Sequence, residues 1–130
     1  MRYLTPRKAA KGLGAAGPST GTAQHWSMTV SSVALLILTP AFIFVIATAL
    51  GLPHHGVFAY FSRPYPAIVT ALFLIAGMYH FVKGTRIMID DYLDHTERKV
   101  AIIFSEMFGW AVIAAAVYAL ARMALSAVIV

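Results

Sequence analysis

Long apolar stretches separated by short polar connections run along most of this chain. Residues 28–62 contain no Asp, Glu, Lys or Arg, and neither do residues 64–82. After Lys99 the only charged residues are Glu106 and Arg122. Uncharged apolar runs of about 18 residues or more are typical of transmembrane helices, which satisfy their own backbone hydrogen bonds. The pattern therefore predicts an all-α membrane protein with three transmembrane helices.

Local signals set the expected boundaries. We predict helices over about 29–50, 66–90 and 98–127, with Ser27 as the first N-cap and a kink at Pro40. Together they form a transmembrane anchor domain, residues 29–130. Residues 1–28 are rich in Gly, Ala, Ser and Thr, lack periodicity and have no apolar run of the kind a secretory signal needs. They are expected to be a basic, irregular cytoplasmic tail.

The connection between the first two helices contains adjacent histidines. Residues 51–56 read as a loop, and its His54 and His55 are more consistent with a solvated turn than with a metal site. Aromatic residues follow, and we expect them at the membrane interface: Tyr60, Phe61 and Tyr65.

Composition narrows the chemistry. The chain has 130 residues, 60% of them hydrophobic, and no cysteine. This excludes disulfides, thiolate-bound iron–sulfur clusters and haem attached through Cys-x-x-Cys-His. A redox cofactor would need histidine or methionine, or another subunit. The net charge of +5 does not indicate nucleic-acid binding, because the basic residues flank the apolar spans.

The distribution of Lys and Arg predicts the orientation. Four lie in the tail and four in the region 83–99, against two elsewhere, Arg63 and Arg122. Because cytoplasmic segments carry the excess of Lys and Arg, the N-terminus and the second connection are expected inside, and the C-terminus outside.

His80 is an ionisable residue within the second apolar span, which makes it a candidate functional residue. Ala76, Gly77 and Gly84 share its helical face. These small residues would admit either a neighbouring helix or a flat macrocycle. The residues alone leave two interpretations open, an axial haem ligand and a histidine that hydrogen-bonds a packed helix.

The end of the same helix carries Asp90, Asp91 and Tyr92. Asp91 lies eleven residues beyond His80, close to three turns, so it would share that face roughly 16 Å nearer the cytoplasm. We expect Asp90 to pair with Arg86 at i+4. A phenol beside a carboxylate could hydrogen-bond a quinone carbonyl and deliver protons, although an ordinary interfacial tyrosine fits as well.

The motif His-x3-Gly-x6-Asp-Tyr, present as His80, Gly84, Asp91 and Tyr92, resembles the hydrophobic membrane anchor of succinate dehydrogenase, the cytochrome b556 D-type subunit of respiratory complex II. The segment before the first span is similar to the alphaproteobacterial branch of that family in these residues: Gly12, Gly14, Ala16, Gly21, Thr22, His25 and Trp26. The resemblance covers nearly the whole chain.

The resemblance implies a role in succinate:ubiquinone oxidoreductase, in the bacterial inner membrane. His80 would be one axial ligand of the iron in a haem b that is shared with a C-type anchor subunit. Tyr92, with Asp91 beside it, would bind ubiquinone, and the iron–sulfur and flavoprotein subunits would dock on the cytoplasmic face. His25 becomes a candidate neighbour of the haem propionates or the quinone, because the arginine common in the family is missing from residues 28–31.

Two other classes of membrane protein are alternatives. A non-redox structural subunit of another membrane complex would use His80 only for packing. A small transporter or channel is disfavoured, because the spans lack internal repeats and paired broken helices.

Overall fold

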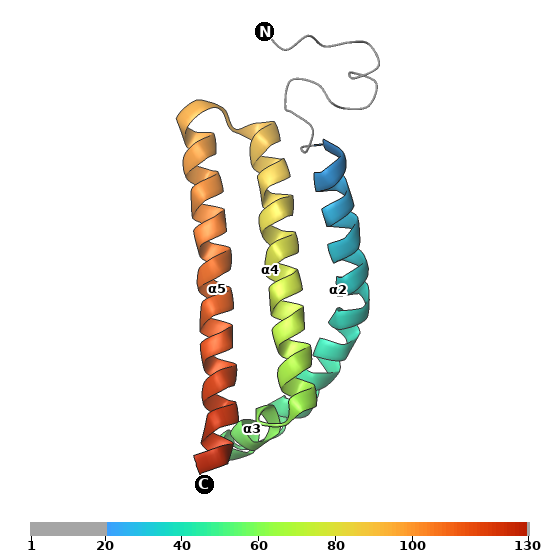
Figure 1. Ribbon diagram of the computed structural model, residues 1–130, viewed down its shortest axis with the longest axis vertical. Helices are drawn as coiled ribbons and strands as arrows, with labels where there is room; N and C mark the ends of the chain where they lie inside the picture. Colours follow the sequence, from blue (N-terminus) through green and yellow to red (C-terminus); the bar gives the residue numbers. More distant parts are fainter. Residues whose placement is uncertain (1–20, 130) are drawn as a thin grey trace.

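The computed structural model describes residues 21–129, which form four helices and no strand. They are α2 (Gly21–Leu50), α3 (His54–Phe61), α4 (Pro64–Tyr92) and α5 (His95–Ile129). Figure 1 shows the three long helices side by side with α4 in the middle and short α3 at the end where the chain terminates. The all-α prediction with three long spans is confirmed. Most of the predicted tail, residues 1–20, lies outside the described part.

Three helices are long and apolar enough to cross a membrane: His25–Leu50, Pro64–Tyr92 and His95–Ser126. In each, only 11% of the most apolar window is buried inside the chain. An isolated water-soluble bundle would bury its apolar side chains, whereas these helices expose theirs to lipid or to other subunits. The chain is therefore a multi-pass membrane protein whose own core is small.

All three long helices begin earlier than the sequence suggested, and α4 does so by two residues, at Pro64 instead of about 66. Helix α2 starts at Gly21 instead of about 29, and α5 starts at His95 instead of about 98. Ser27 consequently lies within α2, and its predicted role as N-cap is wrong. Pro40 lies inside α2 as expected, and Figure 1 shows this helix curving along its length. Proline causes such bending because it removes one backbone donor from the helical ladder.

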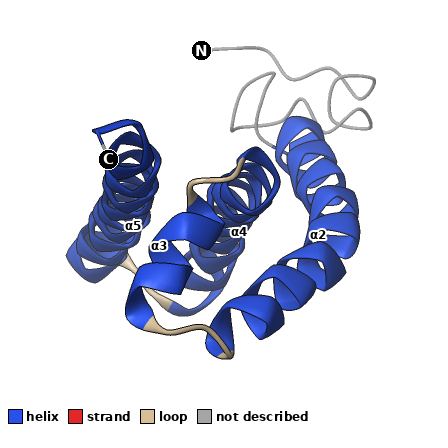
Figure 2. Cartoon of the chain, turned by 90° about the horizontal axis from the view of Figure 1, so that it is seen from below, coloured by secondary structure: helices blue, strands red, loops and turns tan. Residues whose placement is uncertain are grey.

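Helix α3 replaces part of the loop predicted over residues 51–56. It follows Pro53, whose extended conformation leads into the first turn. Its Phe61 is buried against Val45 and Ala49 of α2. Residues of α5 complete this cluster, which closes the end of the bundle seen in Figure 2: Leu120 and Met123. Phe61 is thus a core residue of this cluster, whereas Tyr65 is exposed. The position of these aromatic residues at the membrane interface stays a prediction.

A tight reversal joins α4 to α5. Only Leu93 and Asp94 separate the two helices. The backbone N–H of Leu93 still donates to the Ile89 carbonyl, 2.9 Å away. The next residue, His95, has a φ of 50°, in the left-handed region that non-glycine residues seldom occupy. This conformation turns the chain at once and lays α5 antiparallel to α4.

Helix α4 contacts both other spans, and aromatic pairs mark both interfaces. Phe42 of α2 stacks on Phe73 of α4 with ring centroids 4.0 Å apart and planes 8° apart. Phe81 of α4 meets Phe108 of α5 edge-on at 6.1 Å. His80 therefore belongs to the span that is fixed from both sides.

Candidate functional site

His80 is held by a residue of another span. Its Nδ1 lies 2.9 Å from the Ser31 hydroxyl oxygen of α2. Ser31 is only 6% exposed, and His80 is half-buried. A buried polar pair between apolar helices must satisfy its hydrogen bonds internally. The contact therefore fixes the histidine ring and joins α2 to α4.

The two glycines on the His80 face of α4, Gly77 and Gly84, face side chains of α2. A Cβ on Gly84 would lie 3.6 Å from Met28 Cε, and one on Gly77 would lie 3.9 Å from Leu35 Cδ2. Within the chain, the body that approaches this face is thus the neighbouring helix, one of the two alternatives the sequence left open. Both distances are ordinary van der Waals contacts, so an alanine would fit at either position.

The other imidazole nitrogen of His80 remains available. Within the described residues, Ser31 is the only hydrogen-bond partner of the His80 side chain. No group of three or more His, Cys, Asp or Glu residues in that part of the chain could hold a metal ion. A metal bound here would have one ligand from this chain and would need the rest from a macrocycle or another subunit.

The end of α4 carries the predicted carboxylate and phenol in helical geometry. Helix α4 continues to Tyr92, so Asp91 is still helical and the interval of eleven residues from His80 is maintained. Tyr92 is 82% exposed, and Asp91 is exposed as well. Among the described residues Asp91 makes no ion pair. Both side chains are free to meet a ligand or another subunit, but the structure does not bring them into contact with His80.

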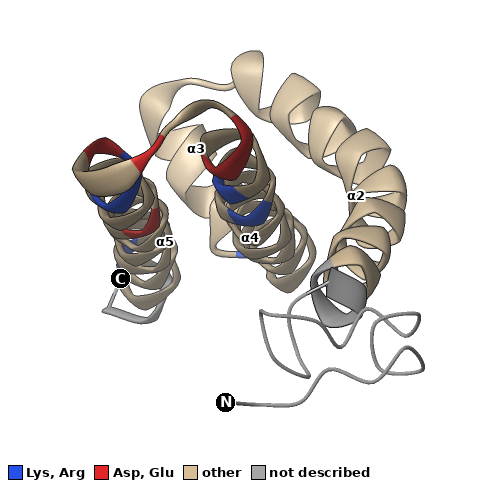
Figure 3. Cartoon of the chain, turned by 90° about the horizontal axis from the view of Figure 1, so that it is seen from above, with Lys and Arg blue, Asp and Glu red and all other residues tan. Residues whose placement is uncertain are grey.

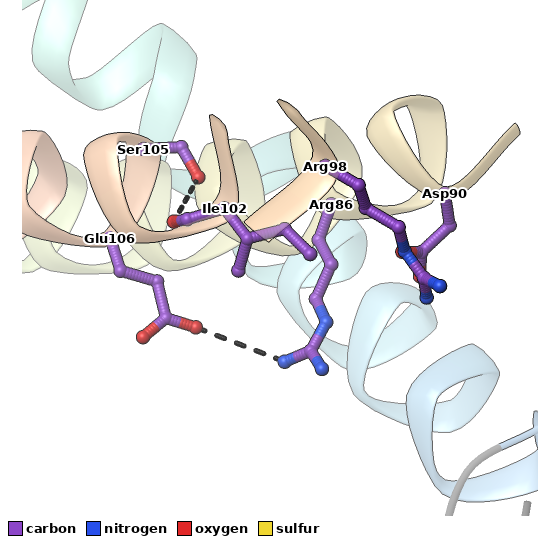
Figure 4. A network of polar contacts seen from close by, with 6 residues as sticks. All are labelled: Arg86, Asp90, Arg98, Ile102, Ser105 and Glu106. Atoms are coloured by element: carbon purple, nitrogen blue, oxygen red, sulfur yellow. Dashed lines mark hydrogen bonds and ion pairs between the residues drawn. The ribbon is translucent and has the colours of Figure 1, made fainter. Parts of the chain in front are cut away.

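An ion-paired cluster connects α4 to α5 near this end (Figure 4). Arg98 Nε lies 2.7 Å from Asp90 Oδ1, and Arg86 Nη1 lies 3.8 Å from Glu106 Oε1. The predicted Arg86–Asp90 pair is wrong. The reversal at residues 93–94 brings Arg98 back beside Asp90, and α5 presents Glu106 to Arg86.

The remaining candidates lie apart from His80. His25 is exposed near the start of α2, and its carbonyl accepts a hydrogen bond from Thr29. His54 and His55 are exposed in the first turn of α3, at the opposite end from the α4–α5 connection. They belong to a helix where the sequence suggested a loop, but they are exposed to solvent as predicted.

Charge is concentrated at the end of α4 and the start of α5. Figure 3 views the molecule from this end and shows Lys, Arg, Asp and Glu on both helices, while the described part of α2 has none. Four basic residues lie here: Lys83, Arg86, Arg98 and Lys99. Only Arg63 and Arg122 carry positive charge toward the other end.

Sequence reasoning missed Ser31. A serine within a span gives little signal by itself, because its hydroxyl can bond to its own helix. Its role depends on the register of α2 against α4, which no local pattern reveals. The contact between Met28 and Gly84 is on the same face and was equally hidden.

The fold and site define a class: a three-span helical membrane subunit with a buried histidine contact in the middle span and a charged end. A family model described as the succinate dehydrogenase/fumarate reductase transmembrane subunit matches residues 1–123. The chain is also 65% identical over 130 residues to the succinate dehydrogenase hydrophobic membrane anchor subunit of Paracoccus denitrificans, covering all of this chain and 99% of that one. No solved structure matches.

The chain belongs to the family of succinate dehydrogenase/fumarate reductase transmembrane subunits. It is a membrane anchor subunit of this class and thus part of an oxidoreductase complex. The resemblance carried by the His80–Tyr92 motif is confirmed at the level of the family.

Proposed function

We propose that this anchor subunit supplies His80 as one axial ligand of a b-type haem, and Tyr92 with Asp91 to a ubiquinone-reduction site. The observation that carries the proposal is the Ser31–His80 contact of 2.9 Å. Metal-ligating histidines nearly always engage their second ring nitrogen in a hydrogen bond. His80 has this arrangement in the apolar part of α4, where residues 64–82 contain no Asp, Glu, Lys or Arg.

The residues present fit a haem shared between subunits. His80 offers one imidazole nitrogen, and no second ligand set exists among the described residues. The other axial histidine would come from a C-type anchor subunit. When bound, the haem supplies one-electron redox chemistry, and this chain holds and orients it through His80.

The end of α4 supports quinone chemistry. Reducing a quinone to a quinol takes two electrons and two protons. The exposed Tyr92 phenol can donate a hydrogen bond to a quinone carbonyl, and the Asp91 carboxylate beside it can pass protons to that position. The electrons would come from succinate through the flavin of the flavoprotein subunit and the clusters of the iron–sulfur subunit.

The charge distribution supports the location and orientation. The excess of Lys and Arg around the α4–α5 connection favours the cytoplasmic side of a bacterial inner membrane, with the N-terminus there and the C-terminus in the periplasm. The soluble subunits would then dock on the end that carries Tyr92. His25, which is exposed near the start of α2, is proposed as a neighbour of the quinone or the haem propionates.

A second candidate role rests on the same contact. A histidine that only joins α4 to α2 would also form a hydrogen bond with Ser31, in an anchor subunit that does not bind haem through this residue. The two roles differ in what His80→Leu does to the purified complex.

The test is an optical spectrum of the complex with His80→Leu in this chain. The proposal predicts loss of haem or loss of its low-spin b-type spectrum, while His55→Leu, an exposed histidine at the opposite end, leaves both unchanged. An unaltered low-spin haem in the His80→Leu complex contradicts the ligand assignment and leaves the packing role.

A further inference from the structure

We infer that Ser31 is a positioning residue that sets the tautomer of His80 and tunes the haem it binds. The inference rests on the proposed haem ligation and goes beyond it, since it concerns which ring nitrogen carries the proton. Ser31 comes from α2 and His80 from α4, 49 residues apart in sequence. The protons available to this pair determine the direction of its hydrogen bond.

The Ser31 hydroxyl has one proton and two neighbours that could receive it. Its oxygen lies 3.0 Å from the Met28 carbonyl, one turn earlier in α2, and 2.9 Å from His80 Nδ1. A carbonyl oxygen can only accept a hydrogen bond, whereas an imidazole nitrogen can donate or accept. When the proton goes to Met28, the serine oxygen is left to accept from Nδ1–H.

This direction of hydrogen bonding determines the chemistry of the ring. A neutral imidazole has one N–H, so a proton on Nδ1 leaves Nε2 with its lone pair. Nε2 can then bind iron. In the reverse arrangement Ser31 donates to Nδ1, Nε2 carries the proton and no metal bond forms there. The Met28 carbonyl thus accepts the serine proton in the tautomer that has its proton on Nδ1, which is the tautomer whose Nε2 can bind iron.

Because Ser31 is buried, its hydrogen bond to His80 does not exchange with hydrogen bonds to water. Ser31 is 6% exposed and lies within a span, so solvent does not compete for Nδ1. A hydrogen bond accepted from Nδ1–H raises the basicity of the ligand and fixes the ring orientation. A more basic axial ligand stabilises the ferric state and lowers the reduction potential of the haem.

The chain offers a matched control in the next residue. Ser32 donates its hydroxyl to the same Met28 carbonyl at 2.8 Å, but it is exposed, and among the described residues it forms no hydrogen bond with His80. Ser32→Ala removes the same chemical group one position away. Any effect on the haem that is specific to Ser31 therefore comes from the imidazole contact.

The experiment measures haem midpoint potential by redox titration, and the low-spin g values by EPR, in the purified complex. Ser31→Ala is expected to shift the potential upward, alter the g values and speed transfer of haem to apomyoglobin by about 10-fold. Ser31→Thr, which keeps the hydroxyl, and Ser32→Ala are expected to match the native complex in all three measurements.

Two results overturn the inference. One is a Ser31→Ala complex whose potential, g values and haem transfer equal those of Ser32→Ala. The other is a Ser31→Thr complex that has bound its haem yet shifts as far as Ser31→Ala. If His80→Leu changes the haem spectrum while Ser31→Ala changes nothing, the positioning role alone fails. If His80→Leu leaves the low-spin haem intact, the ligand assignment fails first.

Discussion

Gly109 of α5 lies so close to Val82 of α4 that a Cβ on the glycine would come within 2.6 Å of Val82 Cγ2. Real Cβ atoms do not approach other atoms this closely, and the branched valine side chain has little freedom to move away. The glycine therefore allows α5 to pack closely against α4. Among the described glycines, it has the shortest such distance.

Gly109→Ala is expected to destabilise the α4–α5 packing. The overlap with Val82 costs about 1–3 kcal/mol, partly offset by the gain in helix propensity of about 1 kcal/mol. The thermal midpoint for loss of this chain from the detergent-solubilised complex should fall. Gly51→Ala is the control, because a Cβ there meets nothing within 4 Å. Equal midpoints for the two variants would show that α4 and α5 pack less tightly.

Asp90 is expected to couple to Arg98 and not to Arg86. Arg98 Nε is within hydrogen-bonding distance of Asp90 Oδ1, at 2.7 Å, whereas Arg86 is directed to Glu106 (Figure 4). Both pairs are part-exposed, so the Asp90–Arg98 coupling should be modest, about 0.2–1 kcal/mol. Double-mutant cycles on the same stability measurement, with Asp90→Asn, Arg98→Gln and Arg86→Gln, test this. If Asp90 coupled to Arg86 instead, the i+4 pair predicted from the sequence would be correct.

The failure of the i+4 prediction shows where sequence reasoning ends. Local spacing places Arg86 one turn from Asp90, and this alone made the pair plausible. The choice between Arg86 and Arg98 is made by the two-residue reversal and the left-handed His95, which bring α5 alongside. Contacts of this kind depend on how the helices pack, and a pattern within one helix does not contain that information.

Hydrophobic pattern predicted the three spans well, because the bilayer imposes length and uncharged composition on each. The short helix α3 was missed, since its eight residues carry two histidines and a glycine and too few turns for periodicity to show. Pro53 just before it was the available signal. For the site, the sequence identified His80 and the helical end at Tyr92, but Ser31 required the register between α2 and α4.

Tyr92→Phe is expected to lower ubiquinone reduction by about 100-fold or more, since it removes a positioned proton donor. Succinate oxidation with an artificial dye acceptor should remain nearly intact, because that reaction bypasses the quinone. Tyr65→Phe provides the control, as an exposed tyrosine at the start of α4. Loss of both activities in Tyr92→Phe would point to failed assembly, and full quinone activity would make Tyr92 an ordinary interfacial residue.

The absence of cysteine allows the orientation to be measured with single substitutions. Leu52→Cys lies in the connection before α3 and Asp94→Cys in the α4–α5 reversal, at opposite ends of the bundle (Figure 1). An impermeant maleimide should label position 52 in spheroplasts. Position 94 should react only after the membrane is opened and the soluble subunits are removed. The opposite pattern would reverse the orientation inferred from the Lys and Arg distribution.

The most direct measurement is a dithionite-reduced minus oxidised optical spectrum of the complex purified through a tag on this chain. We expect a b-type haem signal, with flavoprotein and iron–sulfur subunits in the same preparation. A preparation containing those subunits but no haem would contradict the assignment of His80 and reduce it to the residue that joins α4 to Ser31.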